Sequence, residues 1–224
     1  MKTLMKKLII PVLFISIGSV SAQTINWANL NDGNKHIVNA NLGYDYGLIY
    51  GLGYGQQFKT RLFPIVGSAE FSMPSGNNLL DDFKAKAGAQ VRWIEFYNFQ
   101  FSTKIYGVFR RYENELVRQV NFGSDLTGII GYYRSNWFVS GEVGFDKAIV
   151  TQFKHSKLYR DINPTVLDGW YEPAMGGNFY YGLQAGYSIG KNDFTLRVGK
   201  ILTQDFKTTP MVPFFVQLGY NWKF

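Results

Sequence analysis

The sequence of 224 residues has no cysteine, only two histidines and a charged fraction of 17%. Without cysteine the chain can form neither a disulfide scaffold nor a cysteine-based metal site, and two histidines exclude a histidine-rich one. The charged fraction lies well below the roughly 25% of ordinary soluble domains. The sequence therefore predicts no bound metal.

Three further possibilities are excluded. Aromatic residues make up 17% of the chain, so it is not disordered. No segment after residue 22 approaches about 18 consecutive apolar residues, so no transmembrane helix is predicted. The glycines of residues 51–55 are not directly followed by Lys and Ser or Thr, which excludes a phosphate-binding loop. No cofactor is predicted.

Residues 1–22 are typical of a secretory signal peptide. Three lysines within the first seven residues precede an apolar run over residues 8–17, and the small residues Val20-Ser21-Ala22 suit signal peptidase. The run is shorter than the ~20 residues of a spanning helix. Without those lysines, the chain keeps 20 Lys and Arg against 16 Asp and Glu, an excess too small to predict nucleic-acid binding.

Beyond residue 35 the sequence alternates between apolar and polar or small residues with a period of two, as a strand with two different faces requires. Val38, Leu42 and Tyr44, for example, alternate with Asn39 and Asn41. The pattern recurs in ten segments: 36–46, 48–55, 63–72, 83–93, 97–110, 125–132, 137–146, 178–189, 194–199 and 212–224. Segments of about ten residues match the roughly 9–11 residues of a tilted strand that crosses a bilayer.

The connections alternate in length as well. Short polar turns are expected at 59–60, 95–97, 134–136 and 191–193, and longer connections at 74–82, 111–123, 149–176 and 204–211. Short turns at one end and long loops at the other are the arrangement of a transmembrane barrel. The first connection, near residues 45–47, is an exception because it is tight where a long loop is expected.

The polar face distinguishes this barrel from a soluble one. It combines glycines with the charged residues Asp45, Glu70, Lys84, Lys86, Arg92, Lys104, Arg110, Asp125, Glu142, Asp146, Arg197 and Lys223. A membrane barrel places such residues in its lumen and turns apolar side chains to lipid. Aromatic residues also collect at the strand ends, such as Trp93 and Trp137 at one end and Phe71 and Phe109 at the other, as the two headgroup regions favour.

The last strand carries the most specific motif. Gln217-Leu-Gly219-Tyr-Asn-Trp222-Lys-Phe224 resembles the C-terminal signature that the outer-membrane assembly machinery recognises. The chain thus resembles the small outer-membrane β-barrel proteins of Gram-negative bacteria. The resemblance implies an all-β, antiparallel up-and-down transmembrane barrel, with the assembly machinery and outer-membrane lipids, including lipopolysaccharide, as partners. The expected organisation is a signal peptide at 1–22, a periplasmic segment at 23–34 and a barrel at 35–224, with ten strands and eight or twelve as alternatives.

Near-balance between basic and acidic groups suggests that ion pairs cross a mostly occluded lumen. The long connection 149–176 is the expected surface-binding loop for lipopolysaccharide phosphates or for an unknown protein or small molecule. Its candidate residues are Lys154, His155, Lys157, Arg160, Trp170 and Tyr171. The alternative is that this loop only covers the barrel end.

The sequence thus predicts a barrel with a structural or surface-binding role and no catalysis. A narrow pore for small solutes is the first alternative. A protease that uses Asp81, Asp82, His155, Asp161 and Asp168, or a lipid-modifying enzyme that uses His155 and Ser156, is the second. Neighbouring side chains of an extended segment point to opposite faces, so His155 and Ser156 would not readily share a proton.

Overall fold

The computed structural model describes residues 24–31, 33–44, 47–75, 80–173 and 176–224. The expected signal peptide and Asp45 lie outside the described residues. The long strands are β1 (His36–Tyr44), β2 (Leu48–Lys59), β3 (Pro64–Pro74), β4 (Asp82–Phe96), β5 (Phe99–Glu113), β6 (Val117–Tyr133), β7 (Trp137–His155), β9 (Gly177–Ile189), β10 (Asn192–Thr203) and β11 (Phe214–Lys223). Three short elements accompany them: the 3-10 helix η1 (Trp27–Asn29), α1 (Lys157–Ile162) and β8 (Gly169–Tyr171).

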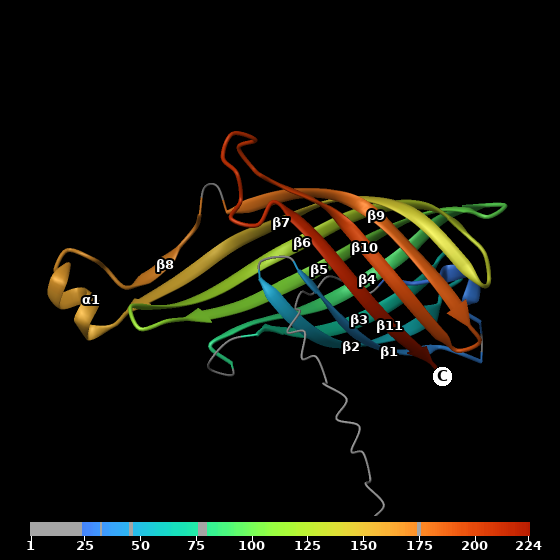
Figure 1. Cartoon of the computed structure of the whole chain (residues 1–224), viewed down its shortest axis with the longest axis horizontal. Coiled ribbons are helices and arrows are strands. Elements are labelled where there is room, and N and C mark those ends of the chain that lie inside the picture. Colours follow the sequence, from blue (N-terminus) through green and yellow to red (C-terminus); the bar gives the residue numbers. More distant parts are fainter. Residues whose placement is uncertain (1–23, 32, 45–46, 76–79, 174–175) are drawn as a thin grey trace, which may run out of the picture.

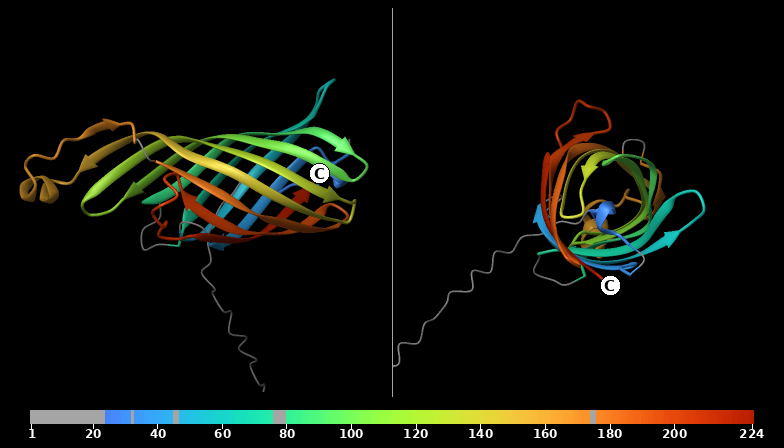
Figure 2. Two further views of the ribbon diagram at one scale, coloured as in Figure 1. Left: turned by 90° about the horizontal axis from the view of Figure 1, so that it is seen from above. Right: turned by 90° about the vertical axis from the view of Figure 1, so that its right-hand side faces the viewer.

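The long strands form a closed antiparallel barrel (Figures 1 and 2). Each long strand pairs with the next long strand along the chain, and β11 pairs with β1 from Tyr44↔Val216 to Ile37↔Lys223. The short β8 pairs only with β7, outside the ring. The prediction of a ten-stranded up-and-down barrel is therefore confirmed.

The strand faces point as the alternation predicts. Leu42, Leu183 and Val216 are 39%, 60% and 41% exposed on the outside, whereas Lys86 and Glu142 are each only 5% exposed inside. An apolar exterior around a polar lumen is stable in hydrocarbon, where a closed barrel satisfies every backbone hydrogen bond. The soluble-barrel alternative is wrong, and the protein spans the outer membrane.

Aromatic side chains surround the barrel near both ends. At the end with longer connections, Phe71, Phe83, Phe109, Phe122 and Trp170 form a row with ring centroids 5.1–6.1 Å apart. At the end with short turns, Phe99, Tyr132 and Trp137 form a similar group. Such belts mark the two headgroup regions, and the short turns identify the periplasmic end. None of the described helices is long and apolar enough to span a membrane.

One expected connection is wrong. β5 continues to Glu113 and β6 begins at Val117, so only residues 114–116 connect them instead of 111–123. The pairing of β6 with β7 shifts by one residue between Phe122 and Gly123. The extra residue, Ile149, belongs to β7, and residues 117–121 of β6 are half-exposed on both faces. The period-two pattern therefore stops before the strand does.

The connection 149–176 is likewise more ordered than a loop. β7 runs 19 residues to His155, and α1 and β8 follow before the chain returns to β9. The side chain of Ser156 caps α1 by accepting a hydrogen bond from the backbone N–H of Tyr159 at 3.2 Å. Residues 149–173, here called the arm, project beyond the cell-surface end of the barrel (Figure 1, left).

The N-terminal segment occupies an unexpected position. Its described residues lie at the end of the barrel with the short turns, where Asn26 contacts Arg134 and Ser188. However, η1 lies within the outline of the barrel when the molecule is viewed along its axis (Figure 2, right). Residues 24–27 are all buried there. We call residues 24–30 the plug.

Candidate functional site

The barrel interior contains an open cavity at its cell-surface end, which we call the vestibule. Its volume is about 580 Å³. Its polar lining includes Lys84, Lys86, Arg110, Gln119, Asn121, Asp125, Asp146, Asn178, Tyr180 and Arg197, and its apolar lining includes Val108, Phe153, Ile201, Val212 and Phe215. β4, β5 and β10 supply the cations, and β6 and β7 supply the carboxylates.

An ion-pair network around Asp125 forms part of the vestibule lining. Lys86 Nζ lies 2.5 Å from Asp125 Oδ2, and both side chains are at most 4% exposed. The Tyr180 hydroxyl donates to Asp125 Oδ1 at 2.6 Å, and Thr127 Oγ1 lies 3.4 Å from the same oxygen. Tyr180 reaches across from β9 because β7 has Gly144 beneath it: a Cβ there would lie 2.3 Å from Tyr180 Cζ.

A second buried pair lies beside the first. Arg197 of β10 forms an ion pair with Glu142 of β7, which also accepts a hydrogen bond from Gln184. The Arg197 guanidinium lies 4.2 Å from the Phe215 ring centroid and 5.4 Å from that of Tyr180. Stacking on aromatic faces suits arginine and fixes its orientation.

The predicted lumen residues occupy this interior as follows. Glu70, Lys84, Lys86, Lys104, Asp125, Glu142 and Arg197 are all buried, and Asp146 lines the vestibule. Arg110 lies at the rim, 2.9 Å from Asp82. Arg92 lies near the periplasmic end, 3.0 Å from Glu95 and above the Trp27 ring. Opposite charges therefore meet across the lumen, as a buried charge requires.

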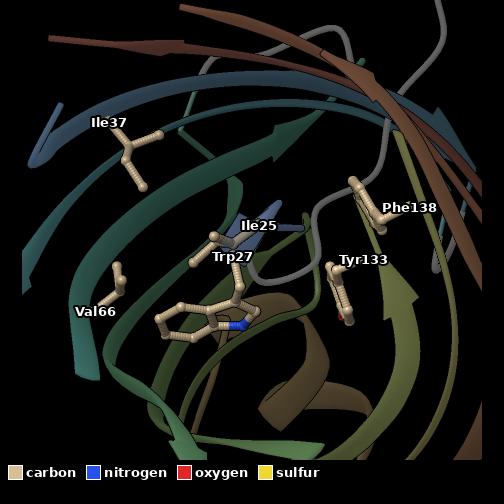
Figure 3. Close-up of a cluster of buried hydrophobic side chains, with 6 residues drawn as sticks. All are labelled: Ile25, Trp27, Ile37, Val66, Tyr133 and Phe138. Atoms are coloured by element: carbon tan, nitrogen blue, oxygen red, sulfur yellow. The ribbon is translucent and has the colours of Figure 1, made fainter. Parts of the chain in front are cut away.

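The periplasmic end, here called the mouth, is filled by the plug. Ile25 and Trp27 pack in one cluster with Ile37, Val66, Tyr133 and Phe138, which point inward from the barrel wall (Figure 3). A further buried ion pair lies at the mouth, with Lys223 Nζ 2.8 Å from Asp193 Oδ1.

The sequence did not predict this plug. The four wall residues of the cluster are apolar at lumen-facing positions, and they all belong to the periplasmic ends of their strands. Apolar residues at these lumen-facing positions, together with the nearby sequence Ile25-Asn26-Trp27, were the sequence signal that indicates a plug. Asp193 and Tyr180 were also missed, because Asp193 falls in the expected turn 191–193 and Tyr180 follows an aromatic residue.

The arm brings some of the predicted loop residues together. The backbone N–H of His155 donates to Asp168 Oδ1 at 2.8 Å, and His155 Nδ1 lies 2.9 Å from the same oxygen. Arg160 Nη1 lies 3.4 Å from Asp168 Oδ2. Lys154 and Lys157 are exposed and lie outside this contact.

Two aromatic residues of β8, the second strand of the arm, make contacts of their own. Trp170 extends the aromatic row at Phe122, with ring centroids 6.1 Å apart, and Tyr171 donates to the Leu167 carbonyl at 3.0 Å. The candidate surface residues therefore form two groups rather than one site.

The residues proposed for catalysis are dispersed. Asp82 binds Arg110 at the vestibule rim, and the Ser156 side chain caps α1. Asp161 is exposed on α1. Only His155 and Asp168 are in contact, as a structural link across the base of the arm.

This link predicts a pH-dependent arm. Hydrogen bonds from the backbone and ring of His155 lower the pKa of Asp168. The link is therefore complete above the ordinary aspartate pKa of about 3.9 and is lost as the pH falls through the lowered value. Hydrogen exchange measured by mass spectrometry should show residues 149–171 loosening in that acid range. Asp168→Asn should abolish the transition, and an unchanged transition in this variant would contradict the assignment.

The predicted assembly residues Gln217, Gly219 and Trp222 lie on β11, and Phe224 directly follows it, beside the β1–β11 closure. Gln217 is buried in the lumen, and Trp222 and Phe224 face outward with ring centroids 4.7 Å apart. Phe224 exchanges two backbone hydrogen bonds of 2.9 Å with His36. The signature thus lies at the junction of the first and last strands.

Comparisons with known proteins were made by sequence and by structure. No family model matches the chain, and no curated protein matches it. Among solved structures, a KdgM porin aligns with a TM-score of 0.40 and 11% identity, over 85% of this chain and 99% of the porin. A structure described as "Unveiling the Mechanism Behind the in-meso Crystallization of Membrane Proteins" gives 0.38 and 10%, over 85% and 84%. A mutant Rh. blastica porin gives 0.20 and 6%, over 85% and 99%.

These TM-scores are too low to support an argument about function. The assignment depends instead on the closed strand pairing and on the apolar exterior around buried ion pairs. The chain thus has the architecture of a small transmembrane β-barrel of the outer-membrane type.

Proposed function

We propose that this barrel is closed to ions at rest and binds a small solute in its vestibule at the cell surface. The observation that carries the proposal is the vestibule itself, an open cavity of about 580 Å³ above two buried ion-pair networks. Ten strands leave little lumen beyond what side chains fill, whereas porins of 16–18 strands enclose a channel.

The lining favours a solute with both polar and apolar parts. Lys86 and Asp125 already pair with each other, so the lining offers polar side chains such as Gln119, Asn121 and Asn178. Apolar side chains such as Phe215 complete the cavity. A small polar solute with an apolar part matches this combination, since its polar groups meet hydrogen-bonding side chains and the remainder meets hydrocarbon.

Single-channel recording tests the closed state. The purified protein in a planar bilayer should give no steady conductance steps, because two ion-pair networks and the plug obstruct the lumen. Steady steps from the unmodified protein would contradict closure. Labelling of Asn121→Cys in intact cells by a membrane-impermeant maleimide tests the vestibule, since this lining position should react from outside.

We also propose that Lys154 and Lys157 contact lipopolysaccharide phosphates, as an exposed lysine pair can. His155 and Arg160 contribute less because both bind Asp168. Glutamine at both lysines should weaken retention of the protein on lipopolysaccharide vesicles relative to the unmodified chain. Equal retention would remove this role.

We propose further that the assembly machinery recognises β11 through its outward aromatic residues. Phe224→Ala should reduce barrel assembly severalfold while leaving export to the periplasm intact. Heat-dependent migration of membrane fractions in gels measures the assembled share. Phe214→Ala, at the other end of β11 and equally outward, is the matched control. Normal assembly of Phe224→Ala would contradict the recognition.

A pore that opens is the second candidate. The plug favours it, because the obstruction at the periplasmic end belongs to a segment separate from the strands.

A further inference from the structure

We infer that the mouth is a peptide-binding site and that the chain fills it with its own residues 24–30, which act as a tethered and displaceable plug. This inference goes beyond solute binding in the vestibule, and neither depends on the other. It concerns the opposite end of the barrel and a different kind of ligand, an extended peptide with a tryptophan.

The plug is buried although it belongs to no strand. Asn26 is 0% exposed, Trp27 3% and Ile25 4%. A segment of this kind is normally found on the surface, because its backbone groups need partners. The burial of residues 24–27 inside the barrel indicates specific recognition by the wall.

Polar groups of the barrel wall form individual hydrogen bonds with the plug. The Asn26 amide donates to Ser188 Oγ at 2.8 Å and to the Arg134 carbonyl at 3.0 Å. The wall in turn supplies donors for plug carbonyls, with Asn221 Nδ2 2.8 Å from the carbonyl of Thr24. The contacts come from β9, β11 and the turn before β7, which lie along one arc of the ring.

The apolar part of the mouth is complementary to Trp27. Ile37, Val66, Tyr133 and Phe138 are each at most 2% exposed with the plug in place. They point into the lumen (Figure 3), whereas the wall toward the vestibule is polar. Without the plug these four side chains would line a water-filled opening, which costs hydrophobic free energy. The mouth therefore has the composition of a binding pocket.

The plug can leave without disturbing the barrel. Within the described part of the chain, the backbone–backbone hydrogen bonds of residues 24–30 are made inside the segment, from Asn29 to Asn26 and from Leu30 to Trp27. No strand pairing includes them. Side-chain contacts hold the plug, and a short connection joins it to β1 at His36.

Because the chain has no native cysteine, a single introduced cysteine is the only thiol that a reagent can label. Val66→Cys places one thiol against the plug, and Asn121→Cys places one in the vestibule as the matched control. The folded full chain should protect Cys at 66 from a charged methanethiosulfonate reagent. Deletion of residues 24–30 should raise its labelling rate by about tenfold or more, which corresponds to exposure of a buried site. The vestibule thiol should react equally in both chains.

A synthetic peptide with the sequence of residues 24–30 provides the second arm. Added to the deleted barrel, it should restore protection at position 66, whereas the same peptide with Trp27→Ala should not. Heat-dependent migration verifies that each variant is folded. If the chain without residues 24–30 does not fold, the full chain with Trp27→Ala is used in its place. This variant should also increase the labelling rate of Cys at position 66. Rapid labelling of the full chain, or no protection by the peptide, would overturn the inference.

Conductance measurements distinguish a plug that blocks ion flow from ion-pair networks that block it. A deleted barrel that conducts until peptide is added from the periplasmic side identifies the plug as the gate of the second candidate function. Peptide protection without conductance confirms the binding site and leaves the ion-pair networks as the remaining barrier.

Discussion

Asp125→Ala is expected to lower the free energy of unfolding of the barrel by about 3–5 kcal/mol, the usual cost of removing one partner from a buried ion pair. Lys86 and Asp125 are both at most 4% exposed, and Tyr180 donates to the same carboxylate. The substitution therefore leaves a buried ammonium and a buried hydroxyl without their main partner. Denaturant unfolding in detergent micelles, followed by tryptophan fluorescence, measures the change.

Two comparisons make this result specific. Glu113→Ala removes one partner of the half-exposed Arg111–Glu113 pair and should cost at most about 1 kcal/mol. The double variant Lys86→Met with Asp125→Leu removes both charges and should be more stable than Asp125→Ala alone. A loss at Asp125 no larger than at Glu113, or equal losses in the double and single variants, would contradict a structural role for the pair.

Leu183→Arg is expected to destabilise the barrel by about 2–4 kcal/mol, because it places a charge at the middle of the lipid-facing surface. Leu183 lies at the centre of β9 and is 60% exposed in the isolated barrel. In water this substitution would be almost neutral, so its cost measures the lipid environment. Unfolding in lipid vesicles gives the free energy.

The matched control is Tyr187→Arg on the same face of the same strand. Tyr187 lies close to the short turn after β9, where the cost of a charge falls to about 0–1 kcal/mol. Leu183→Ala separates the loss of the leucine side chain from the effect of charge. Equal stability of the two arginine variants would contradict the position of the membrane on the barrel.

Much of the architecture could be predicted from the sequence. In β5, Gln100, Ser102 and Lys104 are buried while Phe101 and Ile105 are exposed, as the alternation predicts. Because neighbouring residues of a strand face opposite sides, a local pattern suffices to assign each side chain to lipid or lumen. The number of strands follows from the count of such segments.

The strand ends were predicted less well. β5, β6 and β7 extend beyond the bilayer, where both faces of a strand meet water and no alternation is required. The prediction of a long connection at residues 111–123 was wrong for this reason.

The sequence by itself determined the fold class, the lipid-facing surface and which charges enter the lumen, because each depends only on the period of neighbouring residues. Only the tertiary structure decided that Lys86 meets Asp125, that Arg197 meets Glu142, and that Trp27 enters the mouth. These contacts join residues far apart in sequence across a closed ring. Strand register and barrel closure fix them, and neither is encoded in a local alternation.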